Sequence, residues 1–256
     1  MKPLEQVAQL LANSRWAIAL TGAGISVDSG IPDFRSPGGL WDRFDPFEYA
    51  HIDAFVRSPQ RVWEMLREMQ AVIHAAKPNA GHVALAELEH LGVMHAVITQ
   101  NIDNLHQMAG SHEVIEFHGN GRKLTCLACG AKYDSEEIEK RVRENGVFPP
   151  ECTNDGTILK PDVVFFGEPI PVDASLEAQK QARQCDVILV VGTSVMVFPA
   201  SGIPMLARQT GATVVEINKG ATPLTGSVAH HSLHSSSTEI LPQLAKRVRE
   251  LRKGGK

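Results

Sequence analysis

The chain of 256 residues is poor in cysteine and aromatic side chains and carries no block of like charges. Four cysteines are too few for a disulfide scaffold, and two of them form a C-x-x-C pair, which favours a reducing compartment. A net charge of -4 spread along the chain argues against a nucleic-acid-binding or membrane-surface protein. We therefore expect a cytoplasmic protein that binds neither nucleic acid nor a membrane directly.

Long hydrophobic runs, internal repeats and low-complexity tracts are absent as well. The longest apolar run, VILVVGTSVMVF, is too short and too interrupted to span a bilayer. The first segment, MKPLEQVAQLLANS, has a charge and glutamines within its apolar pattern, so it predicts an amphipathic helix rather than a signal peptide. A chain of this length forms one large domain or a domain with a smaller insertion.

Short apolar runs rich in valine and isoleucine alternate with helical patterns, which is typical of a doubly wound, Rossmann-like α/β fold with a parallel sheet. The predicted strands span residues 15–22, 94–101, 113–119, 162–168, 186–194 and 213–218. The predicted helices span residues 2–13, 59–76, 80–91, 172–184, 199–210 and 238–252. In such folds ligands bind at the carboxyl ends of the strands.

Two regions break this alternation and divide the chain. Residues 120–160 hold cysteines, a charged helical stretch and the turn-rich VFPPECTNDG, and they predict a small inserted module. Residues 35–76 begin with proline, glycine and aromatic side chains, a composition that favours a mobile loop over a ligand, followed by a helix. The remaining segments, about 1–34, 77–119 and 161–256, are predicted to form the large Rossmann-like domain.

The first predicted strand ends in LTGAGIS, with Gly22, Ala23 and Gly24 directly after it. Glycines at this place let main-chain N–H groups approach a diphosphate. A complete dinucleotide fingerprint needs glycine or alanine at position 27, where this chain has Val27. The turn alone leaves two interpretations open, a phosphate-binding turn or a turn needed only for tight packing, and it disfavours an ordinary nicotinamide dehydrogenase.

Polar residues gather at the ends of predicted strands and in the loop after the first one. They are Asp33 and Arg35 on either side of Phe34, then Gln100, Asn101, Asp103 and His106, and finally His118. Each has an ordinary explanation, since asparagine and aspartate often form turns and a lone histidine is more often structural than catalytic. Their combination indicates a catalytic site.

In these motifs the chain resembles the sirtuins, the NAD-dependent protein deacylases, of bacterial or archaeal type. The resemblance covers nearly the whole chain and is carried by GAGIS, GIPDFR, TQNIDNLH, HGN, the CLAC knuckle, KPDVVFFGE, VGTS and VEIN, in the family's order. It implies an NAD-dependent deacetylase that transfers the acyl group of acyl-lysine to ADP-ribose and releases nicotinamide. It also implies NAD as co-substrate and a structural zinc ion.

Roles of individual residues follow from the resemblance. His118 is expected to be the general base, which suits a histidine because its unperturbed pKa lies near the operating pH. Asn101 is expected to be catalytic, and Phe34 to shield the reactive carbon from water. The expected NAD contacts are Gly22, Ala23, Gly24, Ser26, Asp33, Phe34, Arg35, Gln100, Asn101, Ile102, Asp103, Gly192, Thr193, Ser194, Asn218, Lys219 and Ser237.

The resemblance also implies that an acylated protein substrate binds as an added strand between DVVFFGE and the segment after VGTS. Main-chain hydrogen bonds would then supply affinity with little demand on the peptide sequence. Val164, Phe166, Gly167 and Glu168 are expected at the acyl-lysine, whereas Phe165 is expected to be an ordinary core residue.

The acyl group is expected to be uncharged. Desuccinylases of the family carry a tyrosine and an arginine three residues apart on the helix after the first loop, where this chain has Leu66 and Met69. An apolar pair cannot neutralise a buried carboxylate. We therefore predict deacetylation, with longer unbranched acyl groups also accepted because methionine is adaptable.

The zinc ribbon of the family is bound by four cysteines, but here the fourth position holds an aspartate. Cys126, Cys129 and Cys152 match three of the ligands, and Asp155 stands in the fourth place. A carboxylate is a legitimate zinc ligand, so we expect zinc on these four residues. Zinc on the three thiolates alone, and a module without metal, remain alternatives. Cys185 is expected to be a small buried residue.

Two other functions are compatible with the same motifs. One is mono-ADP-ribosylation of proteins, which differs from deacylation in its products. The other is a non-catalytic NAD-sensing interaction module, which would have no need of a base such as His118. The histidines of VAHHSLHSSS, His230, His231 and His234, are interpreted as part of a polar surface loop rather than a metal site.

Overall fold

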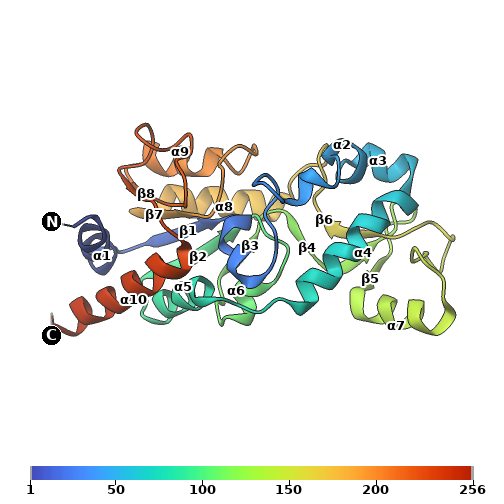
Figure 1. Ribbon diagram of the computed structural model, residues 1–256, viewed down its shortest axis with the longest axis horizontal. Coiled ribbons are helices and arrows are strands. Elements are labelled where there is room, and N and C mark those ends of the chain that lie inside the picture. The colour runs from blue at the N-terminus through green and yellow to red at the C-terminus, as the bar shows by residue number, and fades with distance from the viewer. Residues whose placement is uncertain (1, 255–256) are drawn as a thin grey trace. The chain divides into compact units, whose positions relative to one another are not determined.

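The computed structural model describes residues 2–254, and the chain divides into two compact units (Figure 1). The first unit comprises the segments Met1–Asp33, Ala76–Phe117 and Pro171–Lys256. The second unit comprises Phe34–Ala75 and His118–Ile170.

The first unit is built on a six-stranded sheet in which every strand runs parallel to its neighbours. Its strands are β1 (Ala17–Thr21), β2 (Met94–Thr99), β3 (Val114–Glu116), β7 (Val187–Val191), β8 (Thr213–Ile217) and β9 (His231–Leu233). They lie in the order β3-β2-β1-β7-β8-β9, so the direction of winding reverses between β1 and β7. In doubly wound folds the ligand binds at such a switch point.

Helices cover both faces of this sheet (Figure 1). One face carries α1 (Pro3–Asn13), α5 (Ala80–His90) and α10 (Ser237–Gly254), and the other carries α8 (Val172–Gln184) and α9 (Gly202–Gln209). Short turns of helix follow β1 and β2, namely η1 (Ala23–Ile25), η2 (Val27–Ser29) and α6 (Leu105–Met108). With both faces covered, β1 and β7 are buried at every residue, as their apolar sequences AIALT and VILVV predict.

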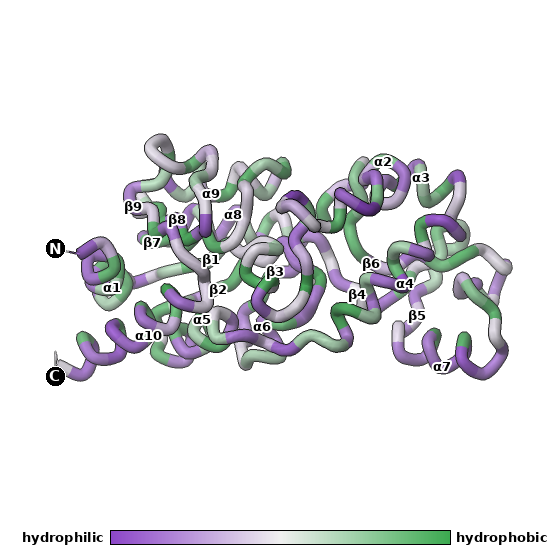
Figure 2. The backbone as a smooth tube through the Cα atoms, viewed as in Figure 1, coloured by the Kyte–Doolittle hydropathy of each residue, from purple (hydrophilic) through white to green (hydrophobic). Residues whose placement is uncertain are grey.

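The main hydrophobic core of the chain lies within this unit. Leu11 of α1, Leu85 of α5 and Leu244 of α10 are fully buried against the strands. Figure 2 shows that α10 nevertheless has a strongly hydrophilic outer side, which is the pattern of a helix with one face on the core.

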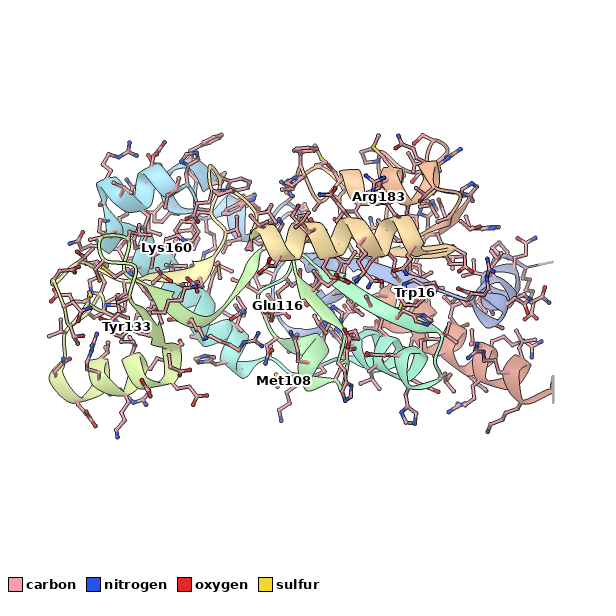
Figure 3. All side chains as sticks on the ribbon, turned by 180° about the vertical axis from the view of Figure 1, so that it is seen from behind. Trp16, Met108, Glu116, Tyr133, Lys160 and Arg183 are labelled. Carbon is pink, nitrogen blue, oxygen red and sulfur yellow. The ribbon has the colours of Figure 1, made fainter. Side chains whose placement is uncertain are left out.

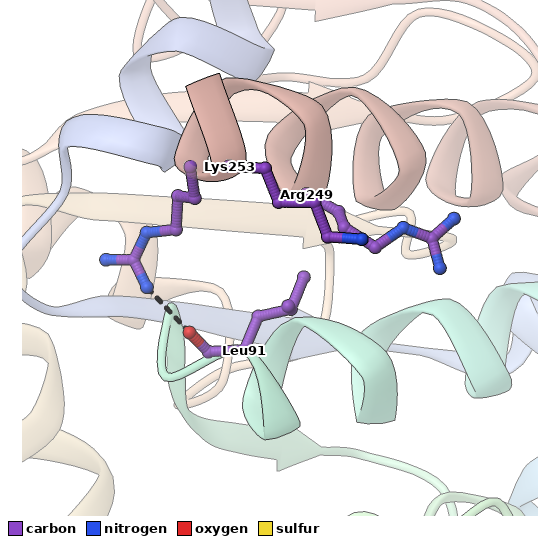
Figure 4. Close-up of a pocket in the computed structure, with 4 residues that line it drawn as sticks. Leu91, Arg249 and Lys253 are labelled. Carbon is purple, nitrogen blue, oxygen red and sulfur yellow. Dashed lines mark hydrogen bonds between the residues drawn. The ribbon is translucent and has the colours of Figure 1, made fainter. Parts of the chain in front are cut away.

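The C-terminal end of α10 is tied to α5 by two arginine side chains, Arg252 and Arg249. Arg252 donates from Nη1 to the carbonyl of Leu91, just after α5, at 2.6 Å (Figure 4). Arg249 and Lys253 line the same hollow, and Arg249 pairs with Glu87 at 3.0 Å. Basic side chains thus satisfy carbonyl groups at a helix C-terminus, so this hollow is structural.

The second unit combines helices with a small antiparallel sheet. Its helices are η3 (Leu40–Asp42), α2 (Pro46–Tyr49), α3 (Ile52–Arg57), α4 (Pro59–Ala75) and α7 (Ser135–Asn145). Its strands, β4 (Gly119–Thr125), β5 (Lys132–Asp134) and β6 (Lys160–Val163), lie in the order β5-β4-β6. The stretch expected as a loop within residues 35–76 therefore holds three short helices before α4.

Five of the six predicted strands are present with shorter bounds, whereas the sixth shares only Asp162 and Val163 with β6. The segment 162–168 was predicted as a strand of the parallel sheet, but β6 ends at Val163 and pairs antiparallel to β4. Residues 161–170 accordingly belong to the second unit, not with the large domain. An apolar run such as VVFF does not reveal its strand partners, and here only Val163 of that run lies in β6 while Phe166 is exposed. The strands β4, β5 and β9 were not predicted.

Within residues 2–254, none of the helices is both long enough and apolar enough to cross a membrane.

Candidate active site

The turns after β1 and β7 touch each other main chain to main chain. Gly24 donates its N–H to the carbonyl of Gly192 at 2.8 Å, and a Cβ on Gly24 would lie only 2.7 Å from that oxygen. A Cβ on Gly192, whose φ is +58°, would lie 2.4 Å from the main-chain nitrogen of Ile25. The glycines thus have a packing requirement of their own at the switch point of the sheet.

A hydrogen-bonded group of polar side chains fills the space beside this turn. The Ser26 hydroxyl donates to Asp103 Oδ2 at 2.6 Å and accepts from Asn101 Nδ2 at 3.1 Å. The Asn101 amide also donates to the carbonyl of Gly22 at 3.2 Å. The predicted residues of two strand ends, after β1 and after β2, are therefore brought into direct contact.

Gln100 connects this group to the turn after β7. Gln100 donates from Nε2 to Thr193 Oγ1 at 3.1 Å and to the carbonyl of Thr21 at 3.3 Å. Val195, two residues after Thr193, has a φ of +56°, which is rare for a β-branched residue. Its N–H donates to Thr193 Oγ1 at 3.2 Å. Strained backbone of this kind is concentrated at functional sites.

Two histidines lie buried behind these groups. The rings of His82 and His106 have centroids 4.9 Å apart and an interplanar angle of 63°. Burial lowers the pKa of His82 to about 4, against an opposing effect of Asp103, and burial beside His82 lowers the pKa of His106 to about 3. Both imidazoles are therefore neutral at physiological pH.

The hydrogen bonds determine which nitrogen of each ring carries the proton. His82 Nδ1 accepts from the N–H of Asn79 at 3.3 Å, so its proton is on Nε2, which faces Ser26 Oγ at 3.4 Å. His106 Nε2 lies 2.9 Å from the hydroxyl of Thr21, and that hydroxyl donates to Thr99 Oγ1 at 3.0 Å. Since the Thr21 proton is already used, His106 must donate from Nε2.

This second chain of hydrogen bonds ends at the main chain of a predicted catalytic residue. Thr99 Oγ1 also accepts from the N–H of Asn101 at 3.1 Å. His106 Nδ1 is buried, and no hydrogen-bond partner for it exists among residues 2–254. Both histidines thus act as oriented neutral donors that hold the polar group around Asn101 in place.

Two of the expected NAD contacts, Asn218 and Lys219, follow β8. Asn218 donates from Nδ2 to the carbonyl of Gly220 at 3.0 Å, and Lys219 pairs with Asp28 at 3.6 Å. Hydroxyl groups of Thr238 and Ser236, then Lys219, lower the pKa of Asp28. Ser237, Ala23, Ser194, Ile102 and Asp33 lie in the first unit as well, and their predicted contacts with NAD stay predictions.

A buried carboxylate on β8 holds the loop that follows this strand. Glu216 is 1% exposed and accepts hydrogen bonds from the hydroxyl groups of Thr222, Thr225 and Ser232, the latter two at 2.7 Å. The histidine-rich segment beyond is partly structural, because His230 Nδ1 accepts from the N–H of Val214 at 3.0 Å and His231 begins β9.

The second unit contains the predicted base and the predicted substrate residues. His118 is half-buried in the turn before β4, and its carbonyl accepts from the N–H of Val164 at 2.9 Å. The next residue, Gly119, pairs with Val163 of β6. The base and the segment expected to bind the peptide are therefore joined through the main chain.

Aromatic side chains of this unit form a row beside that segment. The rings of Phe34 and Trp41 have centroids 5.0 Å apart, and those of Trp41 and Phe166 lie 6.4 Å apart. Phe166 is 40% exposed, whereas Phe165 is buried, as predicted. Arg35 is exposed on the same loop as Phe34. The row provides an apolar wall that can exclude water from a reacting group.

The two predicted metal-binding turns have the same main-chain conformation. In each, the N–H of the first cysteine, Cys126 or Cys152, donates to the carbonyl five residues further on, and its own carbonyl accepts from a glycine four residues further on. Those glycines, Gly130 and Gly156, have φ values of 75° and 74°. Asp155 thus stands where a second cysteine stands in the first turn.

The four side chains converge as a metal site requires. Their ligand atoms all lie within 4.8 Å of one another, with Cys129 Sγ 3.6 Å from Cys152 Sγ and Cys126 Sγ 3.5 Å from either oxygen of Asp155. Tetrahedral zinc with Zn–S bonds of about 2.3 Å needs sulfurs about 3.8 Å apart. Hydrogen bonds, first from the N–H of Thr157, lower the pKa of Asp155 to about 2, so the carboxylate is ionised.

Outer groups orient this cluster. The Tyr133 hydroxyl, labelled in Figure 3, lies 3.1 Å from Cys152 Sγ, and Asn154 Nδ2 lies 3.7 Å from Cys129 Sγ. Donors to sulfur stabilise thiolates, so the residues present fit a structural zinc ion. Cys185 lies outside the cluster and is buried, as predicted.

Sequence reasoning missed the buried supports of the site: Asn79, His82, Thr21, Thr99, Glu216 and Lys160. One signal was available for the first two. Asn79 precedes α5 and has a residue with a hydrogen-bonding side chain, His82, three positions later, which is the spacing of a capping box. The others are single polar residues in apolar strands, and sequence alone does not show their partners.

Three comparisons place this chain among known proteins. A sequence profile of the Sir2 family matches residues 22–199, well over half of the chain. The NAD-dependent protein deacylase 2 of Pyrobaculum aerophilum is 47% identical over 243 residues, which are 95% of each chain. A Sir2 enzyme solved to establish the mechanism and regulation of these enzymes has a TM-score of 0.91 at 42% identity, covering 98% of this chain and 99% of its own.

A second solved structure, of a Sir2 enzyme with a deacetylated p53 peptide and 3'-O-acetyl ADP-ribose, has a TM-score of 0.87 at 38% identity. It covers 97% of this chain and 98% of its own. Family motifs, nearly full-length similarity and the arrangement of polar residues at the switch point agree. The chain belongs to the Sir2 family.

Proposed function

We propose that the protein is an NAD-dependent protein-lysine deacetylase, which transfers the acyl group of acyl-lysine to ADP-ribose and releases nicotinamide. The observation that carries this proposal is the hydrogen-bonded group of Ser26, Asn101 and Asp103 at the switch point of a parallel sheet, in a Sir2 family chain. Its side chains are oriented by neutral buried donors, which is how an enzyme preorganises a polar site.

NAD supplies the electrophilic ribose carbon and the ADP-ribose that accepts the acyl group. We assign its binding to the strand ends after β1, β2, β7 and β8, where main-chain groups and short polar side chains are available. Asn101 and Asp103 are assigned to the nicotinamide end, and Gln100 with Thr193 to the ribose and phosphates. The tight contact between Gly24 and Gly192 supports this, because it keeps side chains out of the switch point.

His118 is assigned as the general base, which takes a proton from a ribose hydroxyl so that the oxygen can attack the acyl carbon. An imidazole can hold and release this proton near neutral pH. Phe34 and Trp41 are assigned to exclude water from the reactive carbon. The contact between their tilted rings, whose centroids lie 5.0 Å apart in the second unit, supports this role.

The acylated protein is assigned to the edge formed by Val164 to Glu168, as an added β-strand. In this segment Gly167 and Phe166 are exposed, so main-chain and apolar contacts are available to a peptide. Cys126, Cys129, Cys152 and Asp155 are assigned as zinc ligands, and unpaired thiols kept for a metal favour a cytoplasmic location.

Acetyl-lysine is the proposed substrate, in preference to succinyl-lysine. Leu66 is buried and Met69 half-buried on one face of α4, three residues apart. A succinyl carboxylate placed against them would be unpaired, which we expect to lower kcat/KM on the order of 100-fold relative to acetyl-lysine. Peptides that differ only in the acyl group measure this ratio, and comparable values would contradict the assignment.

The central test is incubation with NAD and an acetyl-lysine peptide, following nicotinamide release and peptide mass together. We expect nicotinamide release matched by loss of the acetyl group, and a fall of about 100-fold or more for His118→Ala. A peptide that keeps its acetyl group and gains ADP-ribose would establish ADP-ribosyl transfer instead. No NAD-dependent change at all would leave a non-catalytic module.

A further inference from the structure

Lys160 is a buried cation on β6, in the middle of the second unit (Figure 3). Its side chain is only 6% exposed, and the ammonium group lies 2.9 Å from Glu168 Oε2. It also donates to the carbonyls of Pro161 at 3.1 Å and Val163 at 2.8 Å. An ammonium has three protons, so all of its donor capacity is used inside the protein.

Glu168 links the Lys160 ammonium group to the main chain of Phe165. Its Oε2 accepts from the N–H of Phe165 at 2.8 Å, while its own N–H donates to the carbonyl of Phe165 at 3.0 Å. The Lys160 ammonium also lies 4.5 Å from the centre of the Phe165 ring. The turn from Phe165 to Glu168 is therefore closed by both residues and held on the buried cation.

Phe166 and Gly167, the two residues inside the turn, contact the segment from Ala50 to Ile52. Phe166 donates its N–H to the carbonyl of Ala50 at 2.8 Å and accepts from the N–H of Ile52 at 2.9 Å. Gly167 has a φ of +85°, and a Cβ there would lie 2.8 Å from His51 Cε1. Only glycine fits this conformation and this space, so the exposed main chain of the turn has one defined geometry.

A buried ion pair is not the usual means of stabilising a strand. Removing both charges from water costs several kcal/mol per ion, and apolar residues of similar volume often stabilise as well or better. The pair instead fixes the main-chain conformation, because its charge-assisted hydrogen bonds go to the main chain of Pro161, Val163 and Phe165. Phe165 belongs to the segment Val164 to Glu168 assigned above to the substrate peptide, and Val163 directly precedes it.

We propose that Lys160 is a positioning residue for substrate binding, which acts through Glu168 to hold Val164 to Gly167 as a preformed edge for the acyl-lysine peptide. This inference rests on the proposed function. In it, Glu168 supports the peptide from behind, because its carboxylate faces Lys160 and the N–H of Phe165. A preformed edge lowers the ordering cost that an added strand must otherwise overcome.

The test is the steady-state kinetics of Lys160→Met, with Lys132→Met as the matched control. Lys132 forms an ion pair with Asp162 of the same length, 2.9 Å, in the same small sheet, but its side chain is 60% exposed. For Lys160→Met we expect KM for the acetyl-lysine peptide to rise about tenfold, equivalent to one or two main-chain hydrogen bonds, with KM for NAD within about twofold. For Lys132→Met we expect both constants to stay within about twofold.

Removing one partner of a buried pair can also destabilise the fold, so a second variant separates the two effects. Lys160→Met with Glu168→Leu leaves no unpaired charge and is expected to recover thermal stability while the high peptide KM remains. Glu168→Gln keeps an acceptor for the N–H of Phe165 and is expected to give an intermediate KM.

The possible outcomes distinguish this inference from the proposed function. If the unchanged protein does not deacetylate the peptide, the proposed function is wrong. If it does, but folded Lys160 variants keep the same peptide KM, the inference is wrong. An equal rise in KM for peptide and NAD, or an equal effect of Lys132→Met, would also overturn it, because either result indicates general loosening of the unit.

Discussion

The two units of the chain are held together by different means. The main hydrophobic core lies entirely in the first unit, where buried strands meet α1, α5 and α10. The second unit also buries apolar side chains, Trp63, Leu124 and Leu159 among them, but it adds a buried ion pair between Lys160 and Glu168 and a cluster of three cysteines and an aspartate. A large apolar core tolerates local loss, whereas removing one partner of a buried ion pair or a metal ligand disturbs the geometry around it.

This difference matches the parts that the two units are proposed to take. The first unit offers a rigid set of strand ends, on which oriented groups such as Asn101 are held by several hydrogen bonds. The second unit supplies His118 and the peptide edge from a turn and a short sheet. We therefore expect zinc removal to destabilise mainly the second unit, and protonation of the buried histidines to destabilise mainly the first.

Removal of zinc is expected to have the largest effect, and to have it in the second unit. Structural zinc contributes roughly 10–16 kcal/mol to the folding of small zinc peptides at pH 7. With a strong chelator we expect amide protection to be lost across residues 118–170 while β1, β2, β7 and β8 keep theirs. Hydrogen exchange read by peptide mass measures both at once.

The ligand variant sharpens this prediction. Asp155→Ala should bind zinc more weakly than the unchanged protein, and Asp155→Cys should bind it at least as tightly, since the turn already has the conformation of the cysteine-containing one. Metal content and a competition titration with a chromophoric chelator give these affinities. Equal zinc binding by the alanine variant would exclude Asp155 as a ligand.

Mild acid is expected to cause the next largest loss of stability, and to cause it in the first unit, which contains His82 and His106. His82 and His106 have folded pKa values of about 4 and about 3, below the value of about 6.5 in an unfolded chain. Below pH 6.5 the unfolded chain binds protons that the folded chain does not, so stability falls until the pH reaches the folded pKa values. At pH 5 the two groups together should cost about 4 kcal/mol.

Denaturant unfolding at pH 7 and pH 5 measures this loss. His106→Gln should remove about half of the pH-dependent part, whereas His112→Gln, at an exposed position, should leave it unchanged. A loss that is the same in all three proteins would show that other groups are responsible.

Removal of a helix cap is expected to have the smallest and most local effect, a loss of about 1 kcal/mol in the free energy of unfolding in either unit. Asn79 caps α5 in the first unit and also donates to the carbonyl of Ile25 at 2.8 Å, whereas Asp134 caps only α7 in the second. We expect Asn79→Ala to cost more than Asp134→Ala, because it also frees the turn after β1. Thermal unfolding of the two variants decides the order, and a larger cost at Asp134 would contradict it.

The sequence predicted the elements of the large domain well, because its strands are apolar throughout and its helices are amphipathic. It continued a strand of the parallel sheet through VVFF, whereas β6 ends at Val163 and joins a small antiparallel sheet, because an apolar run does not reveal its strand partners. It also missed β9, where HSL has three residues and no apolar pattern. Short strands depend on their neighbours rather than on their own residues.

For the site, the residues to which chemistry is assigned could be selected from the sequence because they occur in motifs with family spacing. Their supports were not, because His82, Glu216 and Lys160 are single polar residues and the sequence does not show which groups they pair with. A buried polar residue is meaningful only when its hydrogen-bond partners are known.

By itself the sequence determined the family, the alternation of strands and helices, and the turn that brings Asp155 to the position of a fourth ligand. Those properties depend on local spacing, hydrophobic period and turn-forming residues, which neighbouring residues specify. The tertiary structure alone decided the proton positions on His82 and His106, the sheet that β6 joins, and the pairing of Lys160 with Glu168. These depend on which polar groups become buried next to one another, and that is decided only when the chain packs, even for Lys160 and Glu168, which lie in one segment.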